Sequence, residues 1–159
     1  MMKTAGLCLL CTSILLFGWN RTRRLYANAE NGKKAVLLIR YIRAQVANFN
    51  MPYDEIFRRC RQRFDGDVFD RLLRERGLGE AMEEAGTELF FDRALYEILS
   101  EFANGLGRSG NEEQLRHCDF YLTRLEERVS AIETALPGQV KVCVSASFAG
   151  AALLLILFL

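Results

Sequence analysis

The sequence predicts an all-α protein in which a polar helical bundle is flanked by two apolar helices. Two uncharged runs of 16 and 18 residues stand near the ends of the chain, at Thr4–Trp19 and Val142–Leu159. Between them apolar residues recur every three or four positions, and no segment alternates apolar and polar residues over the length of a strand. We therefore expect an N-terminal membrane helix at 1–19, a cytoplasmic helical domain at 20–139 and a C-terminal membrane helix at 140–159.

The N-terminal run is short for a membrane helix. At about 1.5 Å per residue it reaches about 24 Å, whereas a hydrocarbon core is about 30 Å thick, so it crosses only by local thinning or with help from its flanks. A cleaved signal peptide is the alternative, since Ala27-Asn28-Ala29 has the small-x-small pattern of a cleavage site. We favour an uncleaved anchor, because three arginines separate that site from the apolar run: Arg21, Arg23 and Arg24.

The same arginines predict the orientation. They follow the first apolar run directly, Lys141 precedes the second, and only Lys3 lies on the far side. The positive-inside rule then places the middle of the chain in the cytoplasm and both ends outside. Anionic lipid is the expected partner of Arg21, Arg23 and Arg24.

The charge balance excludes several classes of function. The chain has 21 Lys and Arg and 20 Asp and Glu, a net charge of +1, so we expect no nucleic-acid binding. The charge is unevenly placed, with a net of +8 over residues 1–76 and −7 over 77–159. A single histidine, His117, leaves no cluster for a metal, and we expect no cofactor.

The cysteines do not form a disulfide framework. Cys8, Cys11 and Cys143 fall inside the apolar runs, where they are typical small apolar side chains. Cys60 and Cys118 are lone thiols of the polar part, in a compartment that we expect to be reducing. The pair therefore offers points for chemical crosslinking to a partner.

A dense basic stretch, Arg58-Arg59-Cys60-Arg61-Gln62-Arg63, has several interpretations. A solvated helix face is the commonest one for such a run. The arginines could also contact anionic lipid or an acidic partner. They could instead pair with the acidic half of the chain, within one copy or between copies.

Turn signals divide the polar part into helices. Gly32 precedes a predicted helix at Lys33–Phe49, and Asn50 is the expected cap of the next helix, with Pro52 in its first turn. The remaining breaks are Asp65-Gly66, which ends that helix, and Gly77 and Gly79, which bound two short helices around Val68–Leu73 and Glu80–Glu88. A stronger apolar stripe then runs from Leu89 and Phe90 to Phe102 and ends at Asn104-Gly105-Leu106-Gly107.

The last predicted helix of the polar part has an N-terminal capping signal and an apolar seam. Ser109 and Glu112 form a predicted capping box. A narrow apolar seam follows at spacings of three and four, made of Leu115, Cys118, Leu122, Leu125, Val129 and Ile132. The seam is either the core of this domain, the commoner outcome, or a surface for a partner helix. Pro137-Gly138 is predicted to interrupt the helix as a hinge before the membrane.

No catalytic constellation is present. Gly105–Gly110 contains three glycines, but it follows a helix and lacks the lysine of a nucleotide-binding loop. Neither apolar run contains the ionisable residue that a small membrane enzyme would need. The C-terminal run instead has small residues at helical spacing, Ala146-x-x-x-Gly150 and Ser147-x-x-x-Ala151, which favour close helix packing and allow a homo-oligomer.

The turn before the last helix carries a family resemblance. Leu106-Gly107-Arg108-Ser109 followed by Asn111-Glu112-Glu113-Gln114-Leu115 resembles stage III sporulation protein AB of endospore-forming bacteria, where an LG-S-D turn and a Gln open a long helix. The whole architecture is similar, including the short first span followed by arginines and the apolar tail. Two departures are Gly110, where the family pattern has an acid, and the break at Pro137-Gly138.

The resemblance implies a fold, a role and partners. The polar part would look like the cytoplasmic domain of a type II secretion inner-membrane platform protein. The chain would be a non-enzymatic scaffold in the mother-cell-derived outer forespore membrane, with other membrane subunits and a cytoplasmic secretion-type ATPase as partners. The matching positions, Leu106, Gly107, Arg108, Ser109 and Gln114, are interface or structural candidates, as are Ala146 and Gly150 of the apolar run. A membrane-anchored adaptor or sensor unrelated to sporulation is the alternative.

Overall fold

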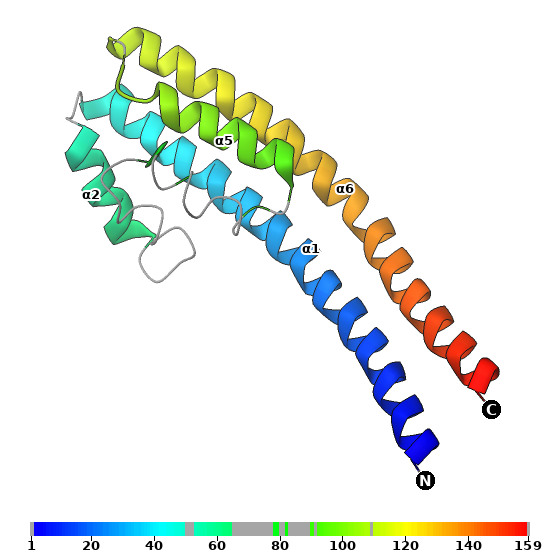
Figure 1. The fold of residues 1–159 in the computed structure, drawn as a ribbon. Helices are drawn as coiled ribbons and strands as arrows, with labels where there is room; N and C mark the ends of the chain where they lie inside the picture. The colour runs from blue at the N-terminus through cyan, green and yellow to red at the C-terminus, as the bar shows by residue number, and fades with distance from the viewer. Residues whose placement is uncertain are drawn as a thin grey trace. The chain divides into compact units, whose positions relative to one another are not determined.

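A computed structural model of the chain describes residues 2–49, 53–64, 78–79, 82, 90, 92–108 and 110–158. These residues contain four helices, α1 (Met2–Phe49), α2 (Tyr53–Arg63), α5 (Arg93–Gly105) and α6 (Asn111–Phe158), and no strand (Figure 1). The predicted all-α class is therefore confirmed for this part of the chain. The helices form two compact units: unit 1 is 1–27 with 133–159, and unit 2 is Asn28–Ile132.

The two long helices continue through both predicted breaks, so these two predictions were wrong. Gly32 lies inside α1, where a Cβ would come within 2.9 Å of Val129 Cγ2, so this glycine permits close packing and does not end a helix. Pro137 lies inside α6. A proline removes one backbone donor, and helix propagation on both sides of it in a 48-residue helix outweighs that loss.

Unit 2 is held by an apolar core shared by all four helices. Ala35, Ile39 and Ile42 of α1 are fully buried, and Ile56 and Cys60 of α2 join them. The predicted stripe of α5 supplies Leu95, Leu99 and Phe102. All six residues of the predicted α6 seam belong to this core or pack against it, which confirms the first interpretation of the seam.

The start of α5 differs from the prediction. The apolar stripe was expected to begin at Leu89 and Phe90, but the helix begins at Arg93, and the buried Phe90 precedes it. Asp92 is the N-cap, with an extended backbone and a side chain that accepts a hydrogen bond from Leu95 N at 2.9 Å. The helix ends at Gly105, as predicted.

The start of α6 lies one residue later than predicted. Gln114 N donates to Gly110 O at 2.9 Å, which makes Gly110 the cap. The predicted capping residue Ser109 lies outside the described residues, as do Asn50, Pro52, the expected helix around Val68–Leu73 and most of Glu80–Glu88. In that last segment Met82 is described and is buried.

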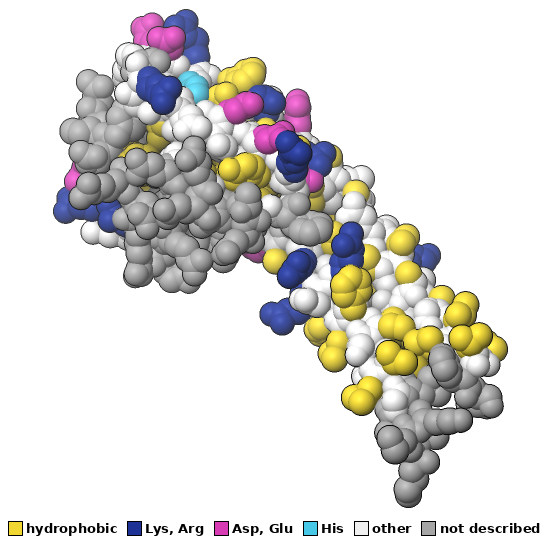
Figure 2. All heavy atoms as spheres, in the orientation of Figure 1, with side chains coloured by type: hydrophobic (Ala, Val, Ile, Leu, Met, Phe, Trp, Pro, Cys, Tyr) yellow, Lys and Arg dark blue, Asp and Glu magenta, His cyan; other side chains and the backbone are white. Residues whose placement is uncertain are grey.

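Unit 1 is a pair of apolar helical segments, residues 2–27 of α1 and 133–158 of α6 (Figure 1). Many of its large apolar side chains are exposed, among them Phe17, Trp19, Phe148 and Ile156. Figure 2 shows apolar side chains gathered over this part of the surface. By length and composition, one helix in the described part of the chain could cross a membrane, Asn111–Leu157, and only 6% of its most apolar window is buried. The N-terminal span therefore stays a prediction.

Candidate interaction sites

The turn between α5 and α6 is built around one buried side chain. Gln114 is fully buried, and its Oε1 accepts a hydrogen bond from Gly107 N at 3.0 Å. Gly107 has a φ of 82°, a left-handed conformation that L side chains rarely adopt. Leu106 packs partly buried against the core, whereas Gly107 and Arg108 are exposed. Gln114 thus fixes the turn from inside, and Arg108 presents an exposed charged side chain on it.

Two further residues of this turn were missed by sequence reasoning. A Cβ at Gly105 would lie 2.2 Å from the imidazole of His117, so only glycine allows the ring to approach the end of α5. The ring lies stacked on Phe102 at 5.4 Å between centroids, and its Nε2 donates to Phe102 O at 3.0 Å. His117 is therefore a structural residue of the α5–α6 contact, and no metal-binding cluster occurs among the described residues.

A second polar cluster joins three helices of unit 2. Asn28 Oδ1 of α1 accepts from Asp92 N at 3.1 Å, and Arg128 Nε of α6 donates to Asp92 Oδ1 at 3.0 Å. The Asp92 side chain is 19% exposed. The hydrogen bond from Arg128 lowers the pKa of the Asp92 carboxyl, and the bond from Leu95 N acts in the same direction. We call Asn28, Asp92 and Arg128 the three-helix clamp.

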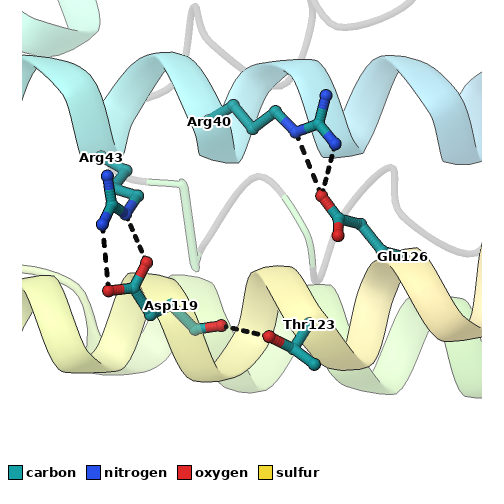
Figure 3. A network of polar contacts seen from close by, with 5 residues as sticks. All are labelled: Arg40, Arg43, Asp119, Thr123 and Glu126. Atoms are coloured by element: carbon teal, nitrogen blue, oxygen red, sulfur yellow. Dashed lines mark hydrogen bonds and ion pairs between the residues drawn. The ribbon is translucent and has the colours of Figure 1, made fainter.

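Ion pairs also connect the basic and acidic halves of the chain. Arg40 of α1 donates to Glu126 of α6 at 2.6 Å, and Arg43 pairs with Asp119 (Figure 3). These four side chains are all substantially exposed, so solvent screening leaves each pair only a small contribution to stability. They join α1 to α6 within unit 2. Each pair neutralises one basic charge of the first half of the chain with one acidic charge of the second half.

The arginine stretch of α2 pairs locally. Glu55 Oε1 accepts from Arg58 Nη2 at 2.9 Å and from Arg59 Nε at 3.0 Å, both within the same helix. These two bonds lower the pKa of Glu55 to about 2. The guanidinium of Arg63 lies over the Tyr41 ring, 5.5 Å from its centroid. Glu55 and Tyr41, which both lie in the basic half of the chain, are therefore among the partners of this stretch.

The two thiols of unit 2 are buried. Cys60 and Cys118 are both fully buried, and burial raises the pKa of Cys60 to about 12 and that of Cys118 to about 11. The expectation that they could serve for crosslinking to a partner is wrong for the folded chain, since neither thiol reaches the surface.

The small residues of the C-terminal run pack against the N-terminal run within unit 1. A Cβ at Gly18 would lie 2.0 Å from Ser147 Oγ, and one at Gly150 would lie 3.7 Å from Ile14 Cγ2. The Cys11 thiol donates weakly to Ala151 O at 3.9 Å. Ser147, Gly150 and Ala151 thus form the face of α6 that contacts the N-terminal run. Ala146 is exposed and points away from this face.

These features define a class of protein: an all-helical polar unit joined to an apolar helix pair whose side chains are exposed. A family model of stage III sporulation protein AB matches residues 3–159. The chain therefore belongs to the stage III sporulation protein AB family, which gives it a role in sporulation. This is a family of sporulation structural proteins and not a known family of enzymes. No curated protein and no solved structure matches the chain.

Proposed function

We propose that this chain is a non-enzymatic platform subunit of a secretion-like complex between mother cell and forespore that is required for endospore formation. The observation that carries the proposal is the division between a polar unit with a shared apolar core and an apolar helix pair that leaves its side chains exposed. Exposed apolar surface of that extent needs lipid or protein around it. The family match supplies the sporulation context and argues against an adaptor unrelated to sporulation.

Two membrane spans are part of the proposal. The candidate span of α6 has a mean hydropathy of 2.2. The packing of Gly18 on Ser147 supports a second span beside it, because small residues let two membrane helices approach closely. Trp19 and Tyr26 are exposed next to Arg21, Arg23 and Arg24, as expected at a membrane interface on the cytoplasmic side.

The proposed partners follow from the family resemblance and from the exposed turn. Unit 2 would stand in the mother-cell cytoplasm, where Arg108 and the neighbouring turn are open to a secretion-type ATPase. The spans would contact other membrane subunits of the complex through the exposed face of α6 that includes Ala146. The resemblance of unit 2 to a type II secretion platform domain belongs to this proposal too.

Deletion of the gene in its spore-forming host tests the function. Under membrane-dye microscopy we expect normal growth and arrest at or after engulfment. Complementation with the full chain restores spores, and a chain lacking 140–159 does not restore them. Normal spores after deletion, or full complementation by the truncated chain, would contradict a membrane platform role.

A further inference from the structure

One exposed face of α1 changes from apolar to basic within unit 1. Leu16, Trp19, Arg23 and Tyr26 follow one another at spacings of three, four and three, so they share one side of the helix. All four side chains are exposed, Trp19 by 69% and Tyr26 by 54%. Figure 2 shows basic side chains beside the apolar surface of the molecule. We call these four residues the interfacial face.

The interfacial face is turned away from the packed side of α1. The Cys11 thiol contacts Ala151 O on that packed side. A Cβ at Gly18 would meet Ser147 Oγ on the same side. At about 100° per residue, Arg23 lies about 140° around the helix from Gly18. The interfacial face is therefore open to a molecule other than the α6 helix of the same chain.

Arg23 is an exposed cation between two aromatic side chains. It has no ion pair or hydrogen bond within the part of the chain that the structure describes, and the first acidic residue of the sequence is Glu30, seven positions further on. Trp19 and Tyr26 lie about one helical turn before and after it. Both have amphipathic rings, which collect at the boundary between headgroups and hydrocarbon. The free guanidinium thus has the neighbours that a headgroup site needs.

The spacing along the helix places this charge at the depth of a lipid phosphate. From Trp19 to Arg23 the helix rises about 6 Å, and the headgroup region adds about 5–7 Å to each side of a hydrocarbon core. With the Trp19 ring at the edge of the core, the guanidinium reaches the phosphodiester, whose two free oxygens suit its planar fork. An acyl chain can lie along Leu16 and Trp19 below it, a contact that a free phosphate cannot make.

We propose that the interfacial face binds the headgroup of an anionic phospholipid, with Arg23 on the phosphate and the acyl chain along Trp19 and Leu16. An anionic lipid is favoured because phosphatidylcholine already carries a cation beside its phosphate. The proposal rests on the second membrane span of the proposed function. Arg24 is the matched control, since it lies about 100° further around the helix and has no aromatic residue one turn before or after it.

The only tryptophan of the chain makes the test direct, because Trp19 belongs to the interfacial face. The full chain is placed in mixed bilayers of phosphatidylcholine and phosphatidylglycerol, with bromine on the acyl chains of one lipid at a time. Bromine quenches tryptophan fluorescence at contact, so the two quenching curves give the lipid composition beside the ring. We expect phosphatidylglycerol to be enriched there about fivefold in the wild type and in Arg24→Gln, and less than about twofold in Arg23→Gln.

Equal losses of enrichment in Arg23→Gln and Arg24→Gln would overturn the proposal, because the lipid would then follow net charge alone. Efficient quenching that does not differ between the two lipids in the wild type would remove the headgroup site and leave the second span in place. No quenching by either lipid would contradict the span as well, since Trp19 would not then contact lipid.

A competition separates lipid from soluble phosphate. Free glycerol phosphate in the buffer should leave the enrichment unchanged, and its loss would assign Arg23 to a soluble phosphate ligand and contradict the proposal. Equal quenching of each variant and of the wild type by brominated lipid in pure phosphatidylcholine shows that the variant inserts normally. If Arg23→Gln does not insert, Arg23→Met replaces it, with the same expected loss of enrichment.

Discussion

The three-helix clamp allows the most detailed prediction. Replacing Asp92 by alanine removes the N-cap bond to Leu95 N and the pair with Arg128. Loss of an N-cap costs about 1 kcal/mol, and loss of a partly exposed ion pair costs up to about 1 kcal/mol. The two contributions predict that Asp92→Ala destabilises the docking of α5 by about 2 kcal/mol. The backbone bond from Asp92 N to Asn28 Oδ1 is unaffected by this change.

Hydrogen–deuterium exchange of α5 in the full chain measures this loss. A destabilisation of about 2 kcal/mol lowers the protection of amides 93–105 about 30-fold. Asp92→Asn keeps a capping side chain but loses the charge, so it should lower protection only about fivefold. Arg93→Ala removes an exposed pair on the same helix and should change protection less than twofold. If Asp92→Ala behaves like Arg93→Ala, the clamp does not hold α5.

The pKa of Asp92 adds a pH dependence with a definite sign. Its folded pKa lies below the ordinary value of 3.8, so its contribution to stability is present above that value and is lost as the pH falls through the folded pKa. The wild-type chain should therefore lose α5 protection in acid more steeply than Asp92→Ala does, and parallel pH profiles would contradict the pairing.

Three further predictions concern the cap of α6, the helix pair of unit 1 and the buried thiols. Gly110→Asp should stabilise α6 by about 0.5 kcal/mol, because the N-cap position has open space and an acidic side chain there interacts favourably with the helix N-terminus. A lower thermal midpoint of this variant would contradict the prediction. Gly18→Ala should lower the aggregation temperature in detergent, since the Ser147 hydroxyl that it meets is held by Cys143 O at 2.9 Å. Gly6→Ala, with nothing within 4 Å, should not lower that temperature. Cys60 and Cys118 should react with maleimide only after denaturation, whereas an Arg108→Cys thiol should react in the folded chain, and equal rates would refute the burial.

The sequence predicted those elements whose signal is local periodicity. The stripe of α5 and the seam of α6 follow spacings of three and four, and both enter the core as expected. The helix breaks predicted at Gly32 and Pro137 were wrong, because a glycine or proline in the sequence does not show which residues pack against it. Gly32 is explained by Val129 and Leu95, which come from distant parts of the chain.

The candidate sites were predictable only in part, because the sequence does not show which distant residues pack together. Leu106, Gly107 and Gln114 were found through the family pattern, but nothing in that pattern indicated that Gln114 Oε1 holds the Gly107 amide. The N-cap signal of Asp92 was present in the sequence, but Leu89 and Phe90 seemed to extend the helix across it. Asp92 contacts Asn28, which lies 64 residues before it, and Arg128, which lies 36 residues after it. No local signal in the sequence predicts these contacts.

Thiol accessibility in intact cells tests the membrane arrangement most directly. A membrane-impermeant maleimide is added to cells that produce either Lys3→Cys or Arg108→Cys. The two-span arrangement predicts labelling of Lys3→Cys in intact cells and of Arg108→Cys only after permeabilisation. Labelling of Arg108→Cys in intact cells, or protection of both thiols until permeabilisation, would contradict two spans around a cytoplasmic unit 2.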